Sequence, residues 1–198
     1  MSSSLRFRNM MAVFFLVLVS LLVLATADSQ LGLEGLFGPK LDVGYVTTKP
    51  DVVNGMLKIA EVNENDTVYD LGCGDGRIVI AAAKEHGAKG VGIDLNPKRI
   101  AEARDNARSA GVEDRVKFEV GDIFKQDFSD ATVVMLYILP EMNRKLRPQL
   151  WKQLKVGSRV VSNESDMGPE WPAEKTEQID GRNVHYWTIR DEHKKAAV

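Results

Sequence analysis

The chain has 198 residues, of which 44% are apolar, and its formal net charge at pH 7 is -2. This length suits one domain with a sizeable core, and the charge lacks the basic excess of a dedicated nucleic-acid-binding protein. A single cysteine, Cys73, excludes an internal disulfide and any zinc site built on several thiolates. The three histidines are scattered without metal-ligand spacing, so we expect no metal.

The first 30 residues differ in kind from the rest of the chain. A Ser-rich flank with Arg6 and Arg8 precedes the uncharged apolar run Met10–Ala27, which ends in Ala-Thr-Ala. These features are typical of a secretory signal peptide, and the Arg-rich, acid-free flank is also typical of an organelle presequence. An apolar run of about 18 residues approaches the length that spans a bilayer. We therefore predict a signal peptide or membrane anchor over residues 1–30 and leave its cleavage open.

A Gly-rich linker at residues 31–44 leads to a folded domain at residues 45–190, and a polar tail follows at 191–198. Apolar side chains after Pro50 recur at helical spacing. Strands then alternate with helices, which predicts βαβ units and a Rossmann-like, doubly wound, mostly parallel seven-stranded sheet in the α/β class. The predicted strands are 67–71, 91–94, 116–120, 132–136 and 159–162, the helices between them are 77–85, 97–110 and 141–154, and a C-terminal antiparallel hairpin turns at Gly181–Arg182.

Three glycines, Gly72, Gly74 and Gly76, lie where strand 67–71 passes into the next helix. Without Cβ atoms they allow a tight turn and let a ligand lie against the backbone. Ligands of open α/β sheets bind at the carboxyl ends of the strands, so this loop predicts a binding site. A plain turn that uses glycine is the alternative. The spacing GxGxG matches neither a Walker A loop nor the GxGxxG dinucleotide fingerprint.

Acidic residues around this loop indicate the kind of ligand. Asp70 and Asp75 disfavour a pyrophosphate and favour a ligand that carries positive charge. Asp94 ends the second strand, where an acid can bind ribose hydroxyls. Asp122 follows the third strand, where a carboxylate can accept a hydrogen bond from an adenine amino group. A nucleoside with a cationic tail meets these demands, which predicts S-adenosyl-L-methionine as the cofactor.

The segments VYDLGCGDGR, GVGIDLNP and VGDIF, in this order and spacing, resemble those of class I S-adenosylmethionine-dependent methyltransferases. The resemblance covers about residues 45–190, and the motifs are specific as a set. It implies that Asp94 binds the ribose and that Asp122 with Ile123 meets the adenine. The methionine end would be lined by Asp70, Gly72, Gly74 and Gly76, and Cys73, Asp75 and Leu95 complete the predicted cofactor site.

Three further segments, GYVTTKPDVVNGML, LYILPEMNRKLRPQL and GSRVVSNESDMGPEW, are similar to a narrower group. It comprises small bacterial methyltransferases and the related membrane-anchored, largely mitochondrial protein-lysine methyltransferases. The resemblance implies a protein-lysine N-methyltransferase that acts by direct in-line methyl transfer. The segment YILPEMN lacks the Asn/Asp-Pro-Pro-Tyr signature of enzymes that methylate adenine or glutamine amide nitrogen. A small-molecule or RNA methyltransferase of the same fold is the alternative, and a nucleotide-dependent oxidoreductase or a cofactor-binding module without catalysis is a more distant one.

A lysine acceptor must lose its proton before it attacks, and an apolar wall favours this by lowering the pKa of the amine. Candidates for the catalytic side are Tyr137, Glu141 and Asp166, of which the two acids would hold the amine or receive its proton. Their alternative roles are a helix-start acid for Glu141 and a turn residue for Asp166. Cys73 suits a small filler of the loop better than a nucleophile. The wall would be formed by Tyr137, Leu139, Pro140, Trp171 and Trp187.

The predicted partners follow from the same features. The segment DMGPEWPA leaves no room for a full helix after the fifth strand, so the substrate-facing cap is small and suits an exposed protein lysine better than a small molecule. We expect no nucleic-acid partner, and we expect a monomer. Membrane association through residues 10–27 is expected, mitochondrial if the chain is eukaryotic, and export after signal cleavage is the alternative. The positive-inside tendency would place the domain across the membrane from Arg6 and Arg8.

Overall fold

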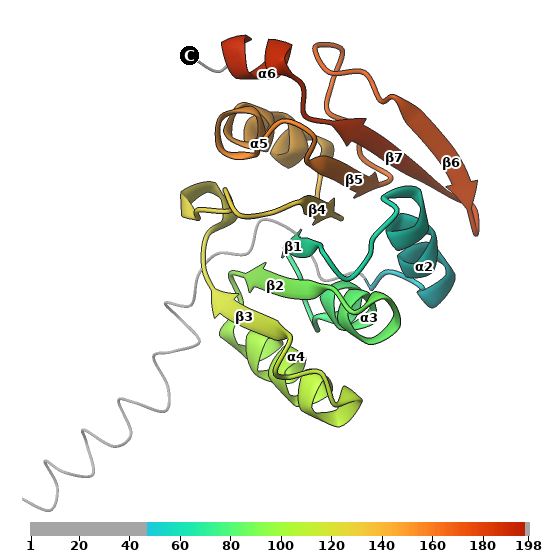
Figure 1. The fold of residues 1–198 in the computed structure, drawn as a ribbon, viewed down its shortest axis with the longest axis vertical. Coiled ribbons are helices and arrows are strands. Elements are labelled where there is room, and N and C mark those ends of the chain that lie inside the picture. The colour runs from blue at the N-terminus through green and yellow to red at the C-terminus, as the bar shows by residue number, and fades with distance from the viewer. Residues whose placement is uncertain (1–46, 197–198) are drawn as a thin grey trace, which may run out of the picture. The chain divides into compact units, whose positions relative to one another are not determined.

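Seven strands form one sheet in the computed structural model, which describes residues 47–196 (Figure 1). The predicted signal peptide or anchor, the linker and the first two residues of the predicted domain lie outside the described residues. The strands are β1 (Thr67–Leu71), β2 (Lys89–Asp94), β3 (Val116–Val120), β4 (Val133–Leu136), β5 (Arg159–Asn163), β6 (Lys175–Ile179) and β7 (Arg182–Thr188). Their order in the sheet is β3-β2-β1-β4-β5-β7-β6. The first five are parallel, and β7 runs antiparallel to both β5 and β6. The predicted α/β sheet with its C-terminal hairpin is therefore confirmed.

Helices cover both faces of the sheet. They are α2 (Pro50–Ile59), α3 (Arg77–His86), α4 (Pro97–Ala110), α5 (Pro140–Gln153) and α6 (Asp191–Ala196), with a short 3-10 helix η1 (Ile123–Lys125) after β3. The buried residues of α2, α3 and α4 share one hydrophobic cluster, and those of α5 belong to a second. No helix of the described part is long and apolar enough to cross a membrane.

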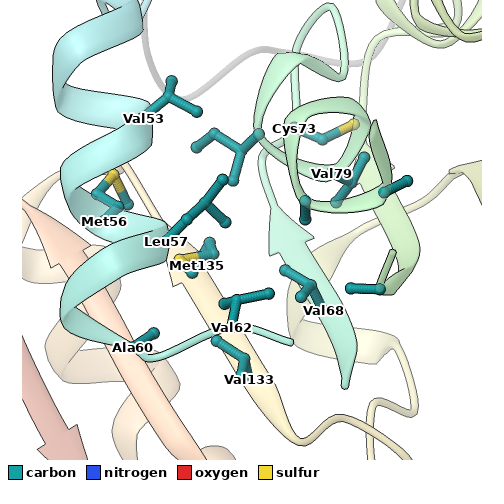
Figure 2. Close-up of a cluster of buried hydrophobic side chains, with 14 of the residues drawn as sticks. Val53, Met56, Leu57, Ala60, Val62, Val68, Cys73, Val79, Val133 and Met135 are labelled. Carbon is teal, nitrogen blue, oxygen red and sulfur yellow. The ribbon is translucent and has the colours of Figure 1, made fainter. Parts of the chain in front are cut away.

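Strand β4 separates the two hydrophobic clusters at the centre of the sheet. All four of its residues are fully buried, as expected for a central parallel strand with both faces covered. Because strand side chains alternate in direction, Val133 and Met135 join the α2–α3 cluster. Figure 2 shows Met135 beside Leu57 and Val133 beside Val62. The alternate residues, Val134 and Leu136, lie on the other face and join the α5 cluster.

Local sequence signals account for most of the element boundaries. The Asn96 side chain accepts a hydrogen bond from Lys98 N at 3.0 Å, which caps α4 at its predicted start. Gly111 ends α4 in the left-handed conformation. The hairpin turn lies at Asp180–Gly181, one residue before the predicted position, because Arg182 already pairs with Ile179 in the β6–β7 ladder.

The C-terminal segment differs from the expected polar tail, since residues 191–196 form α6. The Lys194 ammonium donates hydrogen bonds to the carbonyls of Trp151, Lys152 and Leu154 at the end of α5, at 2.6–2.8 Å. These carbonyls have no partner within α5, so the lysine satisfies the end of a helix that is distant in sequence. A six-residue polar helix of this kind depends on tertiary contacts and has no strong periodic signal.

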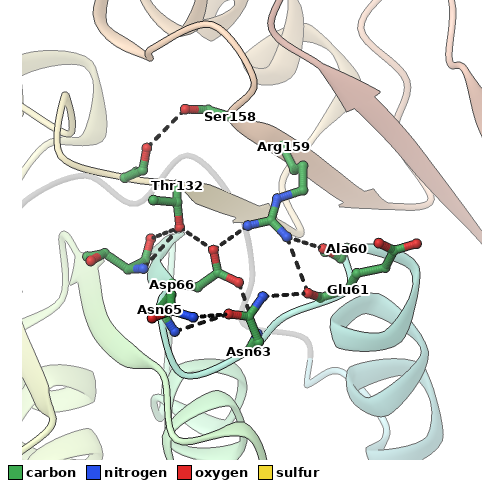
Figure 3. A network of polar contacts seen from close by, with 10 residues as sticks. Ala60, Glu61, Asn63, Asn65, Asp66, Thr132, Ser158 and Arg159 are labelled. Atoms are coloured by element: carbon green, nitrogen blue, oxygen red, sulfur yellow. Dashed lines mark hydrogen bonds and ion pairs between the residues drawn. The ribbon is translucent and has the colours of Figure 1, made fainter.

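A buried ion pair joins the amino ends of the central strands (Figure 3). The Asp66 carboxylate pairs with Arg159 and also accepts hydrogen bonds from Thr132 Oγ1 at 2.6 Å and Asn63 N at 2.9 Å. Arg159 Nη1 donates in turn to the Ala60 carbonyl at 2.6 Å. The network thus connects the end of α2 with the starts of β1, β4 and β5, on the opposite edge of the sheet from the glycine loop.

We expect Asp66→Ala to lower the free energy of unfolding by about 3 kcal/mol, because it leaves the partly buried Arg159 guanidinium without its counter-charge. The matched control is Asp130→Ala, which removes an exposed partner of Lys155 at 4.0 Å and should cost less than about 1 kcal/mol. Urea denaturation of both variants measures the difference. If both variants lower the free energy of unfolding by similar amounts, the Asp66–Arg159 pair does not stabilise the fold as proposed.

Candidate functional site

A cavity of about 280 Å³ opens at the carboxyl ends of β1, β2, β3 and β4. All of the predicted cofactor residues line it except Gly76, so the structure brings together side chains from three successive strand ends. Tyr137 from the predicted catalytic side also lines the cavity. Residues that the sequence reasoning did not single out lie on the same surface, and they include Thr47, Thr48, Arg77, Arg99, Phe124 and Met142.

The glycine loop between β1 and α3 forms the floor of the cavity. Gly72 and Cys73 both donate their backbone N–H to the carbonyl of Ile93, at 2.8 and 3.0 Å, which anchors the loop to β2. Gly76 caps the start of α3 with a φ of 78°, and a Cβ there would lie 2.6 Å from the ring of Phe118. Gly76 therefore packs closely against Phe118 on the side of the loop away from the cavity, while its neighbours line the cavity.

The Asp94 carboxylate bridges the glycine loop and the start of α4. One oxygen accepts a hydrogen bond from Gly74 N at 2.9 Å, and the other accepts one from Asn96 N at 2.8 Å. Both contacts hold the carboxylate in a fixed orientation at the end of β2. Asp122 plays a similar local role after β3, where its side chain accepts from Phe124 N at 3.0 Å and caps η1.

Arg77 fastens the segment before α2 to the glycine loop. Its guanidinium binds the Asp75 carboxylate through two nitrogens, at 2.9 and 2.5 Å, and donates to the Thr48 carbonyl at 2.7 Å. This contact brings Thr47 and Thr48 to the rim of the cavity. Arg77 follows the glycine motif directly. The two threonines belong to the segment GYVTTKPDVVNGML, which carried the family resemblance, but their place at the cavity depends on a contact between residues distant in sequence.

Burial changes the acid–base properties of the loop. Asp70 is only 2% exposed, and burial raises the pKa of its carboxyl to about 8, with the Asp94 and Asp75 carboxylates adding to the rise. Burial also raises the pKa of the Cys73 thiol far above its ordinary value, and the Asp70 and Asp94 charges act in the same direction. A thiol held protonated in this way is a poor nucleophile.

The residues predicted for the acceptor side are separated by the structure. Tyr137 and its neighbour Ile138 line the cavity. Glu141 is exposed in the first turn of α5, and Asp166 is exposed and accepts a hydrogen bond from Gly168 N at 2.9 Å, so neither lines the cavity. Among the other wall candidates, Leu139 and Pro140 are exposed beside the cavity lining, and Trp171 and Trp187 are buried in the α5 cluster.

Tertiary packing explains where the two tryptophans lie. Trp187 Nε1 donates to the Trp171 carbonyl at 2.9 Å, and the Trp171 ring lies 5.7 Å from the rings of both Trp151 and Trp187. The His193 ring of α6 completes this group by stacking on Trp151 at 5.3 Å. The tryptophans therefore stabilise the contact between α5, the hairpin and α6, well inside the core.

Comparisons with known proteins agree with this geometry. Residues 70–175 match the family model of the ANTKMT methyltransferase domain. A protein-lysine N-methyltransferase of Saccharolobus islandicus (strain REY15A) is 45% identical over 155 residues, which cover 77% of this chain and 96% of that protein. An adenine nucleotide translocase lysine N-methyltransferase of Mus musculus is 32% identical over 74% of this chain, which spans 65% of that relative.

A solved structure gives the same fold with a ligand. The crystal structure of an RNA methyltransferase from Salinibacter ruber, in complex with S-adenosyl-L-homocysteine, is 52% identical and superposes with a TM-score of 0.72. The similarity covers 74% of this chain and 95% of that one. With its glycine loop and strand-end acids around one cavity, the chain belongs to the family of the ANTKMT methyltransferase domain and is an S-adenosylmethionine-dependent methyltransferase.

Proposed function

We propose that this methyltransferase transfers methyl groups to lysine side chains of proteins. The observation that carries the proposal is the 45% identity to a protein-lysine N-methyltransferase over 96% of that protein's length. The RNA methyltransferase from Salinibacter ruber, at 52% identity, makes RNA the second candidate acceptor. The charge around the cavity favours lysine, because the part of its lining formed by Tyr137, Ile138 and Met142 carries no carboxylate.

The acidic side suits the cofactor. Asp70 is buried, and no described residue donates a hydrogen bond to its carboxylate, so a cationic group bound there would offset the cost of ionising it. The bare backbone of Gly72 and Gly74 leaves room for the methionine portion. We assign the ribose to Asp94 and the adenine to Asp122 with Ile123, since both acids lie at strand ends of the same edge.

The side formed by β4 and α5 suits a neutral amine. Tyr137, Ile138 and Met142 line it, whereas the carboxylates that line the cavity belong to β1, to the end of β2 and to the loops after β1 and β3. An amine that enters between these side chains loses water, which lowers its pKa and releases its proton to solvent. The bound cofactor supplies an electrophilic methyl group on a sulfonium. The nitrogen lone pair then forms the N–C bond as the C–S bond breaks, and the chain contributes position and exclusion of water.

Cofactor affinity should depend on pH through Asp70. The free protein holds this carboxyl protonated below its pKa of about 8, and a ligand with an ammonium group favours the ionised form, so binding must release the proton. We expect the affinity for S-adenosylhomocysteine to rise by up to about tenfold per pH unit towards pH 8 and then to level off. Isothermal titration calorimetry between about pH 6 and pH 9 measures this profile.

Two variants test the assignment of this pH dependence. Asp70→Asn should flatten the profile, because its amide does not titrate. Asp94→Ala should weaken binding by about 1.5–3 kcal/mol, the cost of removing a charged hydrogen-bond partner, and should move the pH-dependent range to lower pH, because the Asp94 carboxylate contributes to the raised pKa of Asp70. An unchanged slope in Asp70→Asn, or wild-type affinity in Asp94→Ala, would contradict the assigned cofactor site.

The acceptor is tested by methylating a cell lysate with S-adenosylmethionine that carries a labelled methyl group. We expect the label in material that protease digests and nuclease does not, and mass spectrometry should find it on lysine. Tyr137→Ala should lower turnover at least tenfold and leave the affinity for S-adenosylhomocysteine within about twofold. The reason is that Tyr137 lines the side of the cavity proposed for the acceptor amine, which it would position. Label that nuclease removes would replace the lysine proposal with RNA.

The cellular location is proposed from the sequence. We infer that residues 10–27 attach the enzyme to a membrane, with the domain in a compartment that contains S-adenosylmethionine, because the run carries no charge and follows two arginines. Carbonate extraction should leave the full-length protein in the membrane fraction, and protease protection should report the side on which the domain lies. A soluble protein that starts at Asp28 would contradict this inference.

A further inference from the structure

Two serine hydroxyls connect the segments that flank β5 with the segments that flank β4. One lies at the amino end of these two strands and the other at their carboxyl end. Ser158 Oγ donates to the Ala131 carbonyl at 3.2 Å, at the amino end of the strands. Ser165 Oγ donates to the Ile138 carbonyl at 2.7 Å, at the carboxyl end, where the cavity lies. Both serines are buried, at 5% and 6% exposure, so the two ties are matched in chemistry and in environment.

Asn143 of α5 holds the second serine in place. It is fully buried, and its Nδ2 donates to the Ser165 carbonyl and to Ser162 Oγ, both at 2.9 Å, and to the Asp166 carbonyl at 3.4 Å. Its Oδ1 has no hydrogen-bond partner in the described part of the chain. A buried acceptor without a partner costs stability, and an apolar side chain of this size would avoid that cost. We therefore interpret the amide as a group that is retained because its hydrogen bonds hold the loop after β5 in position.

The contact partner of Ser165 belongs to the cavity wall. Ile138 lines the cavity together with Tyr137, and its Cγ2 lies 3.2 Å from the position that a Cβ on Gly72 would occupy. The Ile138 side chain therefore lies close to the glycine loop, and the Ile138 carbonyl is held by Ser165. Loss of the second contact would free the segment from the loop after β5.

We propose that Ser165 and Asn143 are positioning residues for methyl transfer, which set the distance of the Tyr137–Ile138 wall from the bound cofactor. The inference rests on the proposed use of this wall as the acceptor side of the cavity. Neither residue lines the cavity, so their effect must pass through the wall. Since a misplacement of about 1 Å can cost about a hundredfold in rate, loss of the tie should affect turnover much more than cofactor binding.

The test compares Ser165→Ala with Ser158→Ala, each of which deletes one serine-to-carbonyl bond next to β4. We expect Ser165→Ala to lower kcat at least tenfold, with the Kd for S-adenosylhomocysteine within twofold of wild type. Ser158→Ala should change neither quantity by more than twofold, although both variants should lower Tm by a similar amount. Ser165→Thr, which retains a hydroxyl, should restore most of the lost kcat.

Asn143→Leu provides a second measurement if Ser165→Ala gives little folded protein. It should remain folded in a thermal melt, and its kcat should fall at least tenfold. Equal losses of kcat in the two alanine variants, a parallel loss of S-adenosylhomocysteine affinity in Ser165→Ala, or full turnover in a folded Asn143→Leu would overturn the inference. The assay uses whichever acceptor the wild type labels, so an RNA acceptor would refute the proposed lysine specificity and still allow this comparison.

Discussion

The two hydrogen bonds that the Asp94 carboxylate accepts, from Gly74 and Asn96, hold the site together. They fix the glycine loop after β1 against the start of α4 after β2, so two neighbouring strand ends present their backbone to one cavity. The tight packing of Gly76 on Phe118 and the anchoring of Gly72 on Ile93 act on the same loop. Together these contacts fix the loop that lines the cavity.

The cavity also separates two electrostatic environments. Burial raises the pKa of Asp70 on one side of the cavity, and repulsion from the Asp94 and Asp75 carboxylates adds to the rise. A cationic cofactor offsets this repulsion and stabilises the ionised carboxylates. The β4–α5 side presents Tyr137, Ile138 and Met142 and offers a neutral amine no competing anion. One cavity can therefore attract a positive cofactor and still keep its acceptor uncharged.

Local patterns predicted the parts of the molecule that depend on neighbouring residues. Alternating strands, the Asn96 cap and the order of the glycine and acidic motifs sufficed for the sheet and for the residues that line the cavity floor. Tertiary contacts determine the features that the local patterns did not predict. Thr48 reaches the cavity through Arg77, Trp171 turns into the core beside Trp187, and α6 forms on the carbonyl end of α5. None of these three depends on residues close in sequence.

A methyltransferase proposed to act on lysine has lysines of its own, and the ammonium of Lys194 illustrates how a fold can protect one of them. All three of its N–H bonds can be used by the carbonyls of Trp151, Lys152 and Leu154. Each methyl group added to that nitrogen would remove a donor and leave a helix-end carbonyl without a partner. Methylation of the side chain that attaches α6 would thus disturb the fold, and its three hydrogen bonds disfavour that modification.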